Sequence, residues 1–97
     1  MRNNLLKTSI TTFTSLASAT GSATIITAND SRRGLTISNT DANPLYIKFG
    51  ATASATSMTA IVPTFTTWTM TDPIYTGVID GIWTVNGSGA ANATEMT

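Results

Sequence analysis

The sequence predicts an all-β protein, a small β-sandwich or jelly-roll-like domain with an extended N-terminal arm. Short segments in which apolar and polar residues alternate recur along the chain, and clusters of turn residues separate them. Threonine is the commonest residue; it is β-branched and suits a pleated sheet with a polar outer face. Six to eight short strands of this kind are typical of a sandwich or jelly roll.

Length and charge indicate one domain without a nucleic-acid or membrane partner. The 97 residues suit a single core, and we expect an arm and linker over 1–22 and the sandwich over 23–97. Five basic and five acidic residues give a formal net charge of zero, whereas nucleic-acid binding needs clustered Lys and Arg. No run approaches the roughly 20 apolar residues of a membrane helix. The Thr- and Ser-rich segment 8–16 is also too polar for a signal peptide.

The chain has no Cys and no His. This excludes disulfides, thiol nucleophiles, Ser-His-Asp triads and zinc sites of the usual kind. The aspartates are scattered, and three lie in turn contexts where Asp binds the backbone. We therefore expect no enzyme, no metal and no cofactor.

The N-terminal segment is expected to be an extended arm or an edge strand. Its apolar residues are Leu5, Leu6, Ile10, Phe13 and Leu16, in a Thr-rich run that is poor helix material. Residues 15–22 are interpreted as a small-residue linker. Because the later strands fill one core, the apolar residues of the arm are expected to pack on a sister subunit or on another protein of the assembly.

The next strands are expected over residues 23–28, 35–38, 45–49, 58–62 and 65–70. The clearest alternation is in 45–49, which places Leu45, Ile47 and Phe49 inward. Gly50, Pro63 and the Asp72-Pro73 pair mark strand ends, and 51–57 is a loop.

The stretch Tyr75–Trp83 holds the densest apolar cluster and is expected to be a core strand. Gly81 leaves room for the ring of Trp83 to lie over bare backbone. The alternative makes Asp80-Gly81 a two-residue hairpin turn. After a turn over residues 86–89, segment 90–96 is expected to return as an antiparallel partner.

Four side chains of the sandwich are candidate partner contacts, in addition to Leu5, Leu6, Ile10 and Phe13 of the arm. Arg32 and Arg33 form the basic pair and would meet an acidic surface; alternatively they are turn residues, one of them paired with Asp80 or Glu95. Trp68 and Tyr75 are candidate interface aromatics, and core packing is the alternative for both.

Three motifs carry a resemblance: Arg32-Arg33-Gly34-Leu35-Thr36-Ile37, Leu45-Tyr46-Ile47-Lys48-Phe49-Gly50 and Tyr75-Thr76-Gly77-Val78-Ile79-Asp80-Gly81-Ile82-Trp83, followed by Thr94-Glu95. With these the segment from Ala23 to Thr97 resembles small β-sandwich virion structural proteins of tailed bacteriophages, of the capsid decoration (cement) kind. Ala93 stands where a basic residue is expected. No site residues carry over.

The resemblance implies a decoration subunit on the capsid surface of the virion. Its partners would be the major capsid (coat) protein and other copies of itself, as a homo-oligomer and commonly a trimer. Other hypotheses are a head–tail connector, tail or fibre component, or a carbohydrate- or receptor-binding module that exposes Trp68 and Tyr75.

Overall fold

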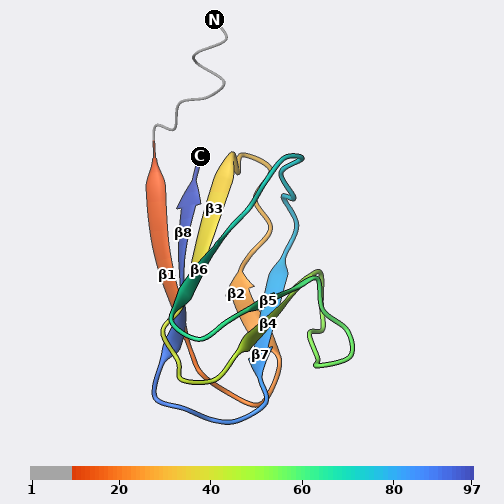
Figure 1. The fold of residues 1–97 in the computed structure, drawn as a ribbon. Helices are drawn as coiled ribbons and strands as arrows, with labels where there is room; N and C mark the ends of the chain where they lie inside the picture. Colours follow the sequence, from red (N-terminus) through yellow and green to blue (C-terminus); the bar gives the residue numbers. More distant parts are fainter. Residues whose placement is uncertain (1–9) are drawn as a thin grey trace, which may run out of the picture.

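The computed structural model describes residues 10–97, which fold as a β-sandwich of two four-stranded antiparallel sheets (Figure 1). All regular structure within these residues is strand, which confirms the all-β prediction. Sheet A has the strand order β1-β8-β3-β6, and sheet B has the order β2-β7-β4-β5. The strands are β1 (Thr11–Ala17), β2 (Ala23–Ile26), β3 (Gly34–Asn39), β4 (Leu45–Phe49), β5 (Ala60–Val62), β6 (Thr66–Thr69), β7 (Ile79–Trp83) and β8 (Ala90–Met96).

The strand pairing has the winding of a jelly roll. From the two ends of the chain inward, β1 pairs with β8, β2 with β7, β3 with β6 and β4 with β5, all antiparallel. Successive pairs alternate between sheet A and sheet B, as they do when one long hairpin is rolled up. The roll places β1 beside β8 at one edge of sheet A (Figure 1).

The core lies between the sheets and follows the alternation of the strands. On β4 the inward positions are those expected, with Tyr46 and Lys48 on the outer side. Small alanines fill the inner face of β8, which lies between β1 and β3. The apolar side chains with no exposed surface are Leu35, Ile37, Leu45, Ile47, Ile79, Ala91 and Ala93.

The stretch Tyr75–Trp83 is a strand only in its second half. β7 runs unbroken through the Asp-Gly pair, so the continuous strand is confirmed and the hairpin alternative is wrong. Residues 75–78 form a loop, in which the main-chain carbonyls of Tyr75 and Gly77 accept hydrogen bonds from Arg32 and not from a neighbouring strand.

The side chains that lie nearest to the bare backbone of Gly81 are those of Ile25 and Leu45. A Cβ placed on Gly81 would lie 2.5 Å from Cδ1 of Ile25 and 3.1 Å from Cδ1 of Leu45. Ile25 reaches this position because a bulge in β2 turns both Ile25 and Ile26 inward. Trp83 is buried, as predicted.

Three further strands, β5, β6 and β8, also differ from expectation. β8 does not return beside β7 but crosses into sheet A. β5 is limited to residues 60–62, and β6 begins only at Thr66, because Phe65 has a left-handed backbone with a φ of 54°.

Part of the segment expected to be an arm belongs to the sandwich. Residues 11–17 form β1, so for them the edge strand, and not the extended arm, is the correct expectation. The linker is shorter than expected and covers residues 18–22. Leu16 packs against the core, and Thr14 Oγ1 donates to the main-chain carbonyl of Ile25 in β2 at 3.4 Å. The core therefore had room for one strand more than the sequence indicated.

Candidate functional site

Two of the predicted arm residues lie on the surface at the edge of sheet A. Phe13 points outward from β1 and is 64% exposed, and Ile10, the residue before β1, is similarly exposed. Leu5 and Leu6 fall outside the described residues. The structure thus presents Phe13 as an unburied aromatic side chain on a regular strand.

The outer face of sheet A around Phe13 carries no charged side chain in the described strands. Threonine, serine and asparagine side chains line it and form hydrogen bonds between neighbouring strands. Ser15 Oγ donates to Asn92 Oδ1 at 2.8 Å, and the hydroxyl groups of Ser38 and Thr67 share a hydrogen bond of 2.7 Å. The register of the sheet aligns these rows across β1, β8, β3 and β6. The face consists of Thr11, Phe13, Ser15, Ala17, Ala90, Asn92, Thr94, Met96, Gly34, Thr36, Ser38, Thr67 and Thr69.

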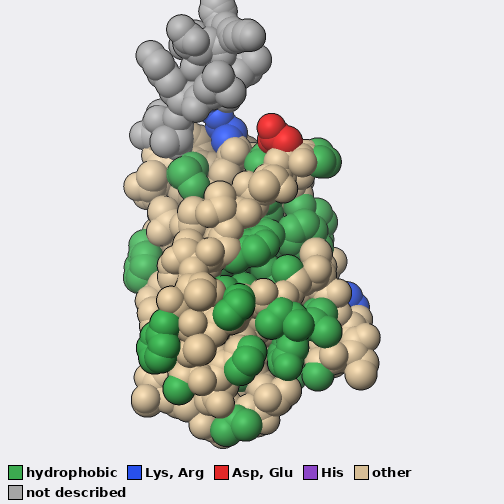
Figure 2. Space-filling view, in the orientation of Figure 1, with side chains coloured by type: hydrophobic (Ala, Val, Ile, Leu, Met, Phe, Trp, Pro, Cys, Tyr) green, Lys and Arg blue, Asp and Glu red, His purple; other side chains and the backbone are tan. Residues whose placement is uncertain are grey.

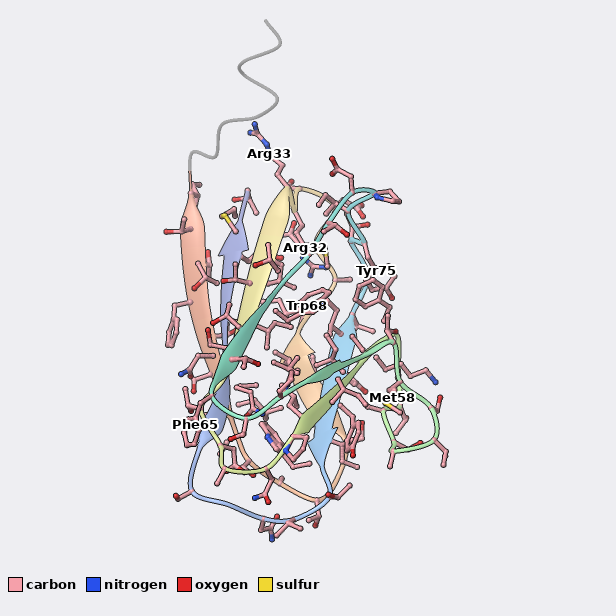
Figure 3. All side chains as sticks on the ribbon, in the orientation of Figure 1. Arg32, Arg33, Met58, Phe65, Trp68 and Tyr75 are labelled. Atoms are coloured by element: carbon pink, nitrogen blue, oxygen red, sulfur yellow. The ribbon has the colours of Figure 1, made fainter. Side chains whose placement is uncertain are left out.

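Trp68 and Tyr75 meet at the opposite side of the sandwich, where both contact Phe49. The rings of Tyr75 and Phe49 are stacked with centroids 4.5 Å apart, and Trp68 meets Phe49 edge to face at 5.9 Å. All three side chains are partly buried and pack against the core. Figure 3 shows Trp68 beside β6 and Tyr75 beside the segment that leads into β7. This cluster closes the side of the sandwich, so both predicted aromatics have mainly a packing role.

Arg32 is buried between the sheets (Figure 3), as expected if one arginine of the basic pair binds a carboxylate of the fold. Its Nε donates to Glu95 Oε2 at 2.7 Å, and its remaining nitrogens donate to the carbonyls of Thr27, Tyr75 and Gly77. Arg32 is therefore not placed to meet an acidic partner.

Arg33 is exposed beside the start of β3 (Figure 3). Its main-chain N–H donates to the carbonyl of Met96 at 2.8 Å, which fixes the backbone while the side chain points away from the sandwich. Of the basic pair, only Arg33 lies on the surface.

The buried carboxylates serve the fold. Glu95 binds Arg32, and Asp80 accepts from Thr24 Oγ1 at 3.0 Å. Asp41 accepts from the main-chain N–H groups of Gly89 and Asn43, both at 2.9 Å. The hydrogen bond from Gly89 chiefly holds the pKa of Asp41 below its ordinary value near 3.8, although burial opposes it.

These carboxylates do not converge on one site. Within residues 10–97 no group of three or more Asp and Glu side chains is placed to hold a metal ion. Their partners are the hydrogen-bond donors of neighbouring loops and strands, so their contribution is to hold those segments in place.

Several exposed apolar side chains were not singled out by the sequence. Phe65, at the left-handed turn before β6, is 72% exposed, and Val85, after β7, is 55% exposed. Ile61 and Met58 are also exposed, on β5 and on the loop before it.

The Pro63-Thr64 pair before Phe65 is the sequence feature that could have predicted the exposure of Phe65, since a turn there removes Phe65 from the strand alternation. Figure 2 shows how apolar side chains spread over this view while charges appear only at its margins.

Comparison of the chain with family models, curated proteins and solved structures finds no match. The described residues contain no helix long and apolar enough to cross a membrane.

Proposed function

We propose that this protein is a non-enzymatic structural subunit of a bacteriophage virion, a decoration (cement) protein that binds the coat protein at the capsid surface and stabilises the coat lattice. The observation that carries the proposal is the outer face of sheet A, a broad uncharged surface rich in hydroxyl groups and bordered by the exposed Phe13. Such a surface has no charge to desolvate when another protein covers it.

The jelly-roll winding gives supporting analogy. Viral capsid proteins are among the established users of this architecture, and lectins are another. A shared fold does not by itself fix a function, so the analogy serves only to rank hypotheses that the surface already favours. It agrees with the resemblance of segment 23–97 to virion proteins.

The structure supports a carbohydrate- or receptor-binding module less well than a decoration protein. A sugar-binding module needs aromatic faces open to solvent, whereas one face of Tyr75 is covered by Phe49 and Trp68 packs edge-on against the same ring. The connector, tail and fibre hypotheses differ from the decoration hypothesis only in the place occupied within the particle.

The test locates the protein in purified particles of the phage that encodes it. We expect mass spectrometry to detect the chain in the particle and cryo-electron microscopy to place its density on the capsid exterior. Absence from the particle would refute a virion role, and density at the neck or tail would replace decoration by the connector or fibre hypothesis.

A variant pair tests the face itself. Thr94→Lys puts a charge at the centre of the outer face of sheet A, opposite Phe13 in the register, while Thr84→Lys puts the same charge on an exposed residue after β7. Thr94→Lys should abolish addition of the purified protein to particles that lack it, and Thr84→Lys should not. Binding by the unaltered protein should persist at about 1 M salt, where exposed ion pairs are screened.

A further inference from the structure

The outer edge of β1 carries backbone groups without a strand partner among the described residues. At its two ends the N–H of Thr97 donates to the carbonyl of Ile10 at 2.9 Å, and the N–H of Ser18 donates to that of Gly89 at 3.0 Å. Hydrogen bonding alternates along an antiparallel strand, so the even-numbered residues of β1 bind β8. The N–H and C=O groups that point to the open edge are those of Thr11, Phe13, Ser15 and Ala17.

The other three sheet edges are poorly suited to accept a strand. β2 has four residues and a bulge, and β5 has three residues followed by Pro63. β6 is bounded by the left-handed Phe65. β1 has seven residues in regular register and contains no charge, proline or glycine. Proteins normally block such an edge with charges, bulges or proline, and β1 has none of these.

We propose that the occupant of this edge is β1 of a second copy, in antiparallel orientation about a twofold axis near Thr14. In that register Phe13 faces Ser15 of the second copy, and Thr11 faces its Ala17. Every outward N–H and C=O group of both strands is then paired, and no like charges are brought together. The two Phe13 rings become diagonal neighbours on the outer face, within reach of aromatic side chains.

The pairing joins two A sheets into one continuous antiparallel sheet. Because both copies use the same edge, the assembly is complete with two copies. A strand of seven residues spans about 24 Å, so the interface is smaller than the standard ~800 Å² per partner and a weak dimer is expected. This contact differs from the threefold assembly that the resemblance implies. It also does not depend on coat binding, since it concerns the isolated protein.

The experiment combines sedimentation equilibrium over a concentration series with hydrogen exchange of the full chain. Mass should rise from monomer to dimer with concentration. In the dilute protein the amides of Phe13 and Ser15 should exchange fast and those of Thr12 and Thr14 slowly. At high concentration this alternation should disappear, because all four amides are then bonded.

Two matched variant pairs isolate the edge. Ser15→Pro removes an outward N–H from β1, and Thr67→Pro removes the equivalent outward N–H from β6; each also removes one lateral hydroxyl contact. Phe13→Lys and Val85→Lys each place a charge at an exposed apolar position. Ser15→Pro and Phe13→Lys should weaken the dimer at least about tenfold, and the two controls should leave it unchanged.

Circular dichroism shows whether each variant remains folded, and Phe13→Lys keeps the test open should Ser15→Pro unfold. A monomer at all concentrations, a trimer, or a dimer in which the Phe13 and Ser15 amides still exchange fast would each overturn the proposal. Failure of the unaltered protein to bind coat particles, with its dimer intact, would instead count against the proposed function alone.

Discussion

The indole N–H of Trp83 donates to the side-chain carbonyl of Asn39 at 3.2 Å, and this buried contact joins β7 of sheet B to β3 of sheet A. The amide of Asn39 in turn donates to the carbonyls of Asn43 and Val62 at 2.9 and 3.0 Å. One polar side chain of sheet A thus satisfies buried groups of sheet B and of the loop after β3.

Replacing Trp83 should remove most of the stability of the domain. Trp83→Ala leaves a large cavity and is expected to lower the free energy of unfolding by about 3–5 kcal/mol, measured by urea denaturation. Trp83→Phe keeps much of the ring and should cost less. In a Trp68→Phe variant, fluorescence comes from Trp83 alone and should be blue-shifted; emission typical of water-exposed tryptophan would contradict the burial.

Breaking the ion pair of Arg32 and Glu95 should be strongly destabilising. Arg32→Met or Glu95→Leu leaves one buried charge uncompensated, so each is expected to cost about 3–5 kcal/mol. The double variant removes both charges and should be more stable than the sum of the two single effects predicts. Additive losses in chemical denaturation would show that the pair is not coupled.

Stability should fall in acid through Asp41. Its pKa is lowered in the folded protein, so its contribution is fully present above the unfolded pKa, near 3.8, and is lost as the pH falls through the lower folded value. Unfolding measured from pH 7 down to about pH 2 should therefore show a loss below about pH 4 that is reduced in Asp41→Asn. The same pH dependence in both proteins would exclude Asp41 as a source.

Gly89 should not tolerate a side chain. A Cβ on Gly89 would overlap the main chain of Asp41, which cannot move aside as a flexible side chain can. We expect Gly89→Ala to destabilise by about 1–3 kcal/mol. Gly21→Ala is the control, because no atom lies within 4 Å of a Cβ there, and it should change stability by less than about 0.5 kcal/mol. Equal melting temperatures for the two variants would argue against this loop geometry.

Deletion of residues 1–20 should impair folding, contrary to what an arm outside the domain would give. It removes β1 and the packing of Leu16, and it leaves β8 unpaired on one side. Deletion of residues 1–9 retains all eight strands and should keep a cooperative thermal transition. A fully stable 21–97 fragment would show that β1 is dispensable.

The sequence predicted those strands in which alternation and turn residues agree. β4 has apolar residues at every second position and ends at Gly50, and its inward set is that observed. β1 was harder to recognise, because Thr12 and Thr14 occupy its inward positions and give almost no apolar contrast. A threonine-rich strand therefore gives the same signal as an extended arm.

Long-range partners lay outside what the sequence could establish. Arg32 and Glu95 are 63 positions apart, and nothing local distinguishes Arg32, which is buried, from Arg33, which is exposed. The crossing from β7 to β8 also has no local mark, since the turn residues 86–89 suit a hairpin equally well. Phe13 was selected correctly as exposed, but the hydrogen-bonding direction of its backbone required the register.

The place of β8 has a consequence for biosynthesis. Because residues 90–96 form the strand between β1 and β3, sheet A has a gap in its middle until the ribosome has made them. The growing chain cannot complete the domain, and this dependence on distant pairings favours slow folding after synthesis. A chain that stops short of residue 90 leaves β1 and β3 each with an unpaired inner edge, open to proteases and to aggregation, so prematurely terminated products should be cleared and not incorporated.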